Sequence, residues 1–253
     1  MVYLIRSEFL KFFKNSKILL TLLVFGIVTL VFGYAYGKSV DNGFLLISRV
    51  LSFLYPFVPF IFTIFGAFSI SSEFENGTIV TILTSTVSRT KVIEIKILFL
   101  AAISMLFSLM LTDILLIPAL IFTHFSGIQV NGYTIISAKS LMGILVMVIF
   151  FTGLSNFVYS LLGLLAGIVL RHSIFSVLAG FFTILTFNIF AILPDINKAV
   201  ITSYSMIPID YFLSCSRGML MQTKWVPGFL TIHAIYTIVL VIFVLLIFRK
   251  IEI

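Results

Sequence analysis

Long runs of apolar residues alternate with short polar segments along the whole chain. Six of these runs are long enough to cross the roughly 30 Å hydrocarbon layer of a bilayer as helices, which takes about 20 residues each. They cover approximately residues 18–36, 45–69, 97–122, 140–170, 174–193 and 227–248. Pro56 and Pro59 fall in the second run and Pro118 in the third, and proline bends a membrane helix without ending it. The pattern therefore predicts a bundle of six transmembrane helices.

The chain begins with a segment that differs from the six apolar runs. Within residues 1–17, apolar side chains such as Phe9 and Phe12 recur at helical spacing, and charged side chains such as Glu8 and Lys11 lie between them. This pattern predicts an amphipathic helix that lies on the membrane surface. A basic tail that merely flanks the first span is the alternative.

The composition leaves no room for a large soluble part. Of the 253 residues, 61% are hydrophobic and 10% are charged, and the mean hydropathy is +1.25. Soluble domains are nearer half apolar and about a quarter charged. We therefore expect an all-α polytopic membrane protein that forms a single domain over residues 1–253. In such a protein the net charge of +7 indicates basic loops beside anionic membrane lipids rather than nucleic-acid binding.

The basic residues are divided unevenly between the two sides that six spans define. One side carries Arg6, Lys11, Lys14, Lys17, Arg89, Lys91, Lys96, Arg171, Arg249 and Lys250. The other side carries Lys38, Arg49, Lys139, Lys198, Arg217 and Lys224. Cytoplasmic loops have the excess of lysine and arginine, so both termini are predicted to be cytoplasmic.

Few residues point to catalysis or to a cofactor. The tripeptide Gly37-Lys38-Ser39 resembles the end of a phosphate-binding loop, but the full pattern needs a glycine where Phe32 stands. The three histidines are far apart and lack the spacing of a metal site. We therefore expect no catalytic, cofactor-binding or metal-binding residue in this chain.

Two features inside the predicted spans require a neighbour. Gly163 and Gly167 are four residues apart, which lets a second helix approach closely. Asp113 lies within the third span, where a carboxylate costs about 3 kcal/mol even on the mildest insertion scale. It is therefore expected to face protein or water. One interpretation is that Asp113 is a polar residue on a transport pathway. The alternative is that it forms a hydrogen bond to another helix, or lies closer to the membrane interface than the predicted span implies.

Residues 70–96, between the second and third spans, form the longest conspicuously polar segment. It begins with Glu73 and Glu75, turns at Asn76-Gly77, and has helical apolar spacing over residues 79–87. A basic stretch follows and leads into the third span. A short helix with one apolar face can rest in a groove of a cytoplasmic partner or touch lipid alone, and periodicity leaves both readings open.

This segment resembles the loop between the second and third spans in permease subunits of type-2 ABC exporters. In that family the loop reads E-x-x-x-G-T, then hydrophobic residues, then a P-V-S-R-like stretch and a downstream lysine. In this sequence the matching residues are, in order, Glu73, Gly77-Thr78, Val87-Ser88-Arg89 and Lys96. Thr86 stands where proline is common. The amphipathic start, the six spans and the segment before the last span also agree, so the resemblance covers essentially the whole chain.

The resemblance implies a permease that dimerises with itself or a close homologue and is driven by a separate ATPase, which binds ATP and magnesium. Residues 70–96 would carry the coupling helix and dock on that ATPase together with the N-terminal helix. Residues 194–226 would re-enter the membrane from the outside and cap the pathway. The residues expected to couple to the ATPase are Glu73, Glu75, Gly77, Thr78, Arg89 and Lys96. Of these, Arg89 is able to pair with a carboxylate of the ATPase.

The substrate is predicted from composition and resemblance together. The 29 phenylalanines offer an apolar wall that suits amphipathic peptides, lipids or hydrophobic drugs. The sequence looks nearest to permeases of peptide export and self-immunity, so we predict export of an amphipathic peptide, toxin or antimicrobial across a bacterial cell membrane. One alternative is an ion-gradient-driven secondary transporter that uses Asp113. Another is a membrane scaffold or sensor that transports nothing.

Overall fold

A computed structural model describes residues 2–14, 16–80, 88–126, 128–130, 133–193, 199–217 and 224–250. Its helices are α1 Val2–Lys14, α2 Ser16–Gly37, α3 Gly43–Leu54, α4 Val58–Glu75, α6 Arg89–Phe122, α7 Ala138–Leu170, α8 Ser173–Ile192, α9 Ile201–Ser205, α10 Ile207–Ser216 and α11 Trp225–Arg249. The 3-10 turn Tyr55–Phe57 joins α3 to α4. Strands β1 Ile128–Val130 and β2 Tyr133–Ile136 form an antiparallel hairpin.

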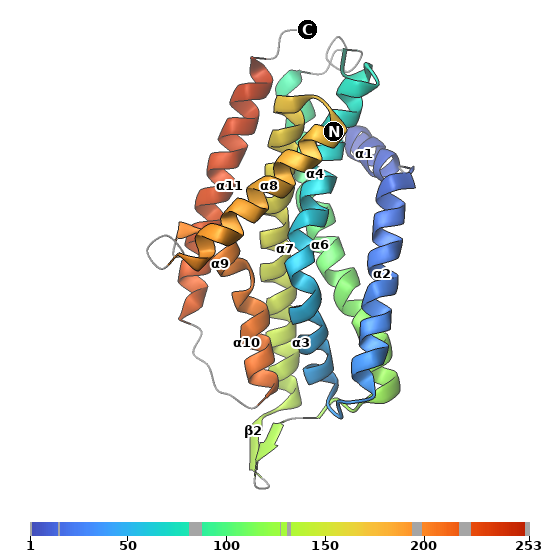
Figure 1. The fold of residues 1–253 in the computed structure, drawn as a ribbon, viewed down its shortest axis with the longest axis vertical. Coiled ribbons are helices and arrows are strands. Elements are labelled where there is room, and N and C mark those ends of the chain that lie inside the picture. The colour runs from blue at the N-terminus through green and yellow to red at the C-terminus, as the bar shows by residue number, and fades with distance from the viewer. Residues whose placement is uncertain are drawn as a thin grey trace.

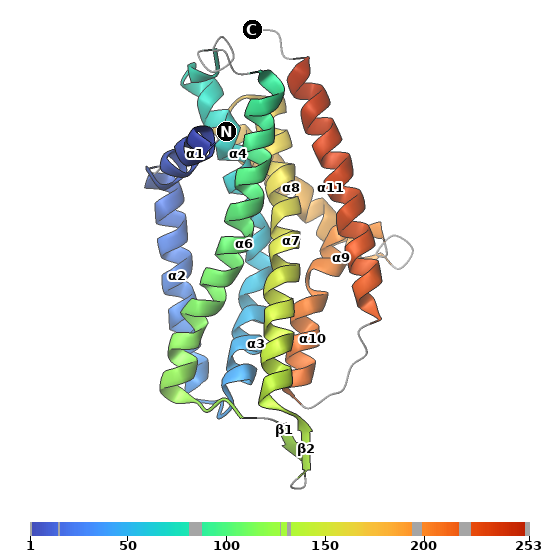
Figure 2. The ribbon, with the colours of Figure 1, turned by 180° about the vertical axis from the view of Figure 1, so that it is seen from behind.

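Within these described ranges, six helical segments are long and apolar enough to cross a membrane, so the predicted number of spans is confirmed. They are Ile18–Gly37, Gly43–Glu75, Arg89–Phe122, Ala138–Leu170, Ser173–Ile192 and Trp225–Arg249. Figure 1 shows them as one elongated bundle, with α8 crossing it at a slant. Helix α1 and the end of α11 lie at one end of the bundle, here called the α1 end, and β1 and β2 lie at the other, the hairpin end (Figures 1 and 2).

Helices α4 and α7 form the centre of the bundle, and glycines set the distance between them. A side-chain carbon at Gly66 would overlap the backbone of Ser160, and one at Gly163 would overlap the backbone carbonyl of Thr63. The close packing predicted for Gly163 is therefore confirmed, and its partner is α4. The second span also bends as its prolines predict, because Pro56 lies in the 3-10 turn between α3 and α4.

The prediction was wrong about where two helices end. Helix α4 continues to Glu75 and α6 already begins at Arg89, so both ends of the expected loop 70–96 are helical. Polar side chains mark the edge of the membrane, but they do not end a helix, since the backbone hydrogen bonds continue beyond it. Of the helix predicted over residues 79–87, residues 79 and 80 are helical, and residues 81–87 lie outside the described part of the chain.

Helix α1 is present as predicted, but part of its apolar face packs against other helices. The Phe12 ring packs edge-on against Phe65 and Phe99 at centroid distances of 5.1 and 5.3 Å. Leu10 and Phe13 are exposed. The apolar side chains of α1 are thus divided between the bundle and the outer surface, which fixes α1 to α4 and α6.

The segment 194–226 contains two short helices, α9 and α10. Helix α10 packs beside α3 and α7 in the half of the bundle nearer the hairpin end (Figure 1). Next to it, the Tyr159 hydroxyl of α7 donates to Ser205 Oγ of α9 at 2.9 Å. Residues 194–198 and 218–223 lie outside the described ranges. The predicted capping of a pathway by this segment stays a prediction.

Candidate functional site

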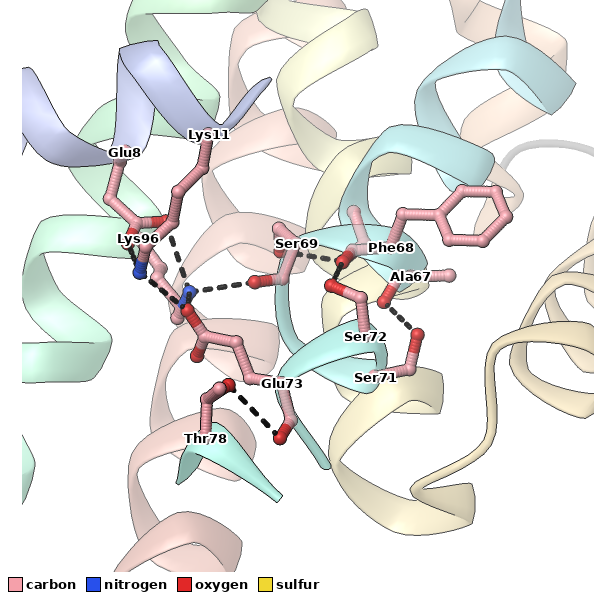
Figure 3. Close-up of polar contacts among 11 residues, drawn as sticks. Glu8, Lys11, Ala67, Phe68, Ser69, Ser71, Ser72, Glu73, Thr78 and Lys96 are labelled. Atoms are coloured by element: carbon pink, nitrogen blue, oxygen red, sulfur yellow. Dashed lines mark hydrogen bonds and ion pairs between the residues drawn. The ribbon is translucent and has the colours of Figure 1, made fainter. Parts of the chain in front are cut away.

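Four charged side chains from three helices meet at the α1 end, and Figure 3 shows them reaching toward one another. Glu73 Oε1, near the end of α4, lies 2.9 Å from Lys11 Nζ of α1 and 3.0 Å from Lys96 Nζ of α6. Glu8 of α1 pairs with the same two lysines, at 2.9 Å to Lys11 and 3.0 Å to Lys96. We call Glu8, Lys11, Glu73 and Lys96 the ion network. It joins α1, α4 and α6.

The ion network is largely removed from solvent. The Lys96 side chain is 1% exposed, Glu73 8% and Glu8 11%, whereas Lys11 is 51% exposed. Lys96 Nζ also donates to the backbone carbonyl of Ser69 at 2.6 Å. A buried charge is tolerated when it is paired and hydrogen-bonded. Two carboxylates and two ammonium groups meet this requirement and balance each other in charge.

The charges on α1 respond to this environment. Burial by itself would raise the pKa of Glu8, but the ammonium groups of Lys96 and Lys11 outweigh it and hold that pKa below its ordinary value. Burial would lower the pKa of Lys11, but the carboxylates of Glu73 and Glu8 outweigh it and raise that pKa. Both groups are therefore held in their charged forms around neutral pH.

Glu75, two residues further along α4, connects this helix to α8. Its Oε1 accepts the backbone N–H of Ser173 at 2.8 Å, and its Oε2 accepts the Ser173 hydroxyl at 2.7 Å. His172 Nδ1 lies 3.3 Å from the same carboxylate. A carboxylate at a helix N-terminus satisfies a free N–H and meets the positive end of the helix dipole. The end of α4 is thus held to α1 and α6 by Glu73, and to α8 by Glu75.

The chain leaves α4 through a tight turn. Gly77 has φ of +67°, a conformation that glycine adopts without strain, and a side-chain carbon there would meet nothing within 4 Å. Thr78 is exposed, and its hydroxyl donates to the backbone carbonyl of Glu73 at 3.4 Å. The turn therefore presents Gly77 and Thr78 at the surface directly beside the ion network.

The structure brings most of the predicted coupling residues to one end of the bundle. Glu73 and Lys96 touch directly, Thr78 bonds to the backbone of Glu73, and Arg89 is the exposed first residue of α6, two helical turns before Lys96. Because Glu73 and Lys96 are buried inside this chain, any role they have in coupling is to hold helices together. The exposed residues Thr78 and Arg89 remain suited to direct contact.

Asp113 lies apart from this group. It is on α6, about 25 Å beyond Lys96 at 1.5 Å per residue. Its side chain is exposed on the outside of the bundle and makes no hydrogen bond or ion pair with the residues that the structure describes. Asp113 thus does not face the interior of its own bundle. Its predicted place on a transport pathway stays a prediction and would require the outer face of α6.

Sequence reasoning missed two members of the ion network, Glu8 and Lys11. Both were assigned to the polar face of an interfacial helix. A signal was present, since an acidic and a basic residue three apart on a helix are neighbours. That pairing is seen at 2.9 Å. The pairing of Glu8 with Lys96 on α6 and of Lys11 with Glu73 on α4 joins residues far apart in the sequence, so local spacing could not predict it.

The interior of the bundle contains further polar contacts between helices. Ser155 Oγ of α7 lies 2.8 Å from His233 Nε2 of α11, and Asn156 Nδ2 donates to Ser108 Oγ of α6 at 3.0 Å. Such hydrogen bonds hold membrane helices together. Within the described ranges, no three His, Cys, Asp or Glu side chains come together as a metal site would require.

Comparison with known families identifies the chain. A family model described as ABC-2 family transporter protein matches residues 4–185, which is more than half of the sequence. The match contains the whole ion network, the bond from Glu75 to α8, four of the six spans in full and the first part of the fifth, α8. No curated protein matches the sequence significantly. This chain therefore belongs to the ABC-2 transporter family, as a multi-pass membrane permease of an ABC transporter.

Proposed function

We propose that this permease is the membrane subunit of an ATP-driven exporter, and that a separate ATPase docks at its α1 end, which faces the cytoplasm. The observation that carries the proposal is the arrangement at the end of α4. There Glu73 binds α1 and α6, Glu75 binds α8, and the exposed Gly77-Thr78 turn follows at once. ATP and magnesium would bind to the ATPase.

A force applied near Thr78 would reach several helices together. Glu73 couples α4 to α1 and α6, and Glu75 couples it to the start of α8. Helix α4 also packs closely along α7. In this account Glu73 and Lys96 are positioning residues that make the α1 end rigid. Thr78 and Arg89 are the residues that contact the ATPase.

The outer surface of the bundle supports the proposed substrate and second subunit. Helices α8 and α11 expose many apolar side chains, among them Phe175, Phe182 and Phe243. Such faces suit a second permease copy or close homologue, with lipid around the pair. We propose an amphipathic peptide, toxin or antimicrobial as the substrate, because an apolar surface of this kind can contact the apolar part of such a molecule. We also propose a bacterial cell membrane as the location.

Arg89→Ala is expected to leave the permease and its ATPase assembled through their other contacts but to lower ATP-driven export, because the charged contact through which Arg89 receives the movement of the ATPase is lost. The measurement is ATP-dependent uptake of a fluorescent amphipathic cationic peptide into inside-out vesicles. Lys38→Ala is the matched control, since Lys38 is an exposed basic residue that directly follows α2, and α2 ends at the hairpin end (Figure 1). Normal uptake with Arg89→Ala would contradict the role given to Arg89, and equal loss in both variants would point to a general charge effect.

A further inference from the structure

An open cavity of about 270 Å³ lies among α1, α4 and α6, directly against the ion network. Its lining combines apolar residues, among them Phe12, Phe68 and Phe99, with polar ones, among them Ser72, Lys11 and Glu73. A water molecule occupies about 30 Å³ of liquid, so the cavity has room for a much larger group. Its mixed lining suits a ligand that is itself amphipathic.

Glu73 supplies an acceptor that the described residues leave unused. Its side chain is 8% exposed, and its Oε1 pairs with both lysines of the ion network. Its Oε2 is buried and has no hydrogen-bond partner among the described residues. Buried carboxylate oxygens in proteins are nearly always paired with a donor. A bound ligand with a hydrogen-bond donor would give this oxygen of Glu73 a partner.

The cavity lies at the depth where lipid headgroups meet the chain. Phe12 belongs to the surface helix α1, and Ile18, which also lines the cavity, is the first residue of the first span. Immediately after it, Leu19 and Leu20 are exposed on the outside of α2. A lipid beside α2 would therefore have its headgroup level with the cavity mouth.

The charges of the ion network select among lipids. Two carboxylates and two lysines already balance, so a headgroup with a net charge would upset that balance. A zwitterionic headgroup adds no net charge. It brings a cation for Oε2 of Glu73, which has no partner among the described residues, and an anion for Lys11, whose side chain is 51% exposed.

We propose that this cavity is a binding site for a zwitterionic aminophospholipid. Its primary ammonium group hydrogen-bonds to Glu73, its phosphate lies toward Lys11, and its glycerol and first methylene groups lie against the apolar lining residues Phe12 and Phe99. The proposal rests on the cavity and the ion network alone, and it does not depend on docking of an ATPase.

The test is native mass spectrometry of the purified full chain, titrated separately with phosphatidylethanolamine, phosphatidylcholine and phosphatidylglycerol of the same acyl chains. Phosphatidylethanolamine is expected to bind at least about tenfold more tightly than phosphatidylcholine, because a quaternary ammonium has no N–H to donate and a hydrogen bond to a charged group is a strong one. Equal binding of these two lipids, or tightest binding of the anionic phosphatidylglycerol, would overturn the proposal.

Ser72→Leu localises the effect without touching the ion network. Ser72 lines the cavity, and its hydroxyl bonds to the backbone carbonyl of Phe68 within the helix, so leucine there fills the cavity and should abolish the lipid preference. Thr231→Leu is the matched control, since Thr231 is exposed on α11, far along the chain, and does not line the cavity. A preference that survives Ser72→Leu would overturn the proposal. A second outcome would also overturn it: the wild-type protein shows no lipid preference, and Ser72→Leu loses an ATPase that the wild-type protein binds. The cavity would then hold part of another protein.

Discussion

Replacing Lys96 with methionine is expected to lower the free energy of unfolding by about 3–5 kcal/mol, the usual effect of removing one member of a buried ion pair. Methionine fills a similar volume, so the loss is electrostatic. Glu73 and Glu8 would keep Lys11 as their shared cation, and Lys11 is half exposed. The measurement is thermal unfolding in detergent. The matched control is Lys91→Met, an exposed lysine on the same helix, which should change stability by no more than about 0.5 kcal/mol.

A second substitution shows whether the loss comes from the ion network. Lys96→Met combined with Glu73→Gln removes both charges of one pair, so the combined loss should be smaller than the sum of the single losses by roughly 0.5–3 kcal/mol. Strict additivity would mean that the two residues do not interact. A Lys96→Met variant as stable as Lys91→Met would show that Lys96 is not buried.

Gly163→Ala is expected to destabilise the protein by about 3 kcal/mol or more, at or above the upper end for overpacked sites. The added carbon would overlap the backbone carbonyl of Thr63 on α4, and a backbone cannot rotate away as a side chain does. Helices α4 and α7 would have to separate along their shared centre. Thermal unfolding of the purified variants in detergent measures the change.

Gly143→Ala on the same helix is the matched control. A side-chain carbon at Gly143 meets nothing within 4 Å, so alanine there should be neutral or should stabilise α7 by up to about 1 kcal/mol through its higher helix propensity. If Gly163→Ala and Gly143→Ala have the same stability, then α4 does not approach α7 as closely as described.

The six spans were predictable because the membrane imposes a length and a polarity on each one. The helix ends were not predictable in this way. Ser71, Ser72 and Glu73 look like a loop by their polarity, yet the hydroxyls of both serines bond back to the carbonyls of Ala67 and Phe68 within α4. Polarity reports where the lipid ends, and it says little about where the backbone leaves the helix.

The candidate site was predicted in part. The motif directed attention to Glu73, Glu75 and Lys96, and the structure places all three at the α1 end. Their partners were not predictable, because Lys11 is 62 residues from Glu73 and Glu8 is 88 residues from Lys96 in the chain. The packing of α1 on the bundle, through Phe9 and Phe12, brings them together. The same packing explains why Glu73 and Lys96 are buried, where the motif alone suggested contact with another chain.

The most direct test of the central claim is photo-crosslinking from the exposed turn after α4. A benzophenone amino acid at Thr78, in the full chain in its native membrane, is predicted to crosslink to an ATP-binding polypeptide. The same probe at Lys38, which is also exposed but directly follows the end of α2 at the hairpin end, is predicted to give no such product. Crosslinking of an ATP-binding polypeptide from Lys38, or its absence from Thr78, would contradict docking of an ATPase at the α1 end.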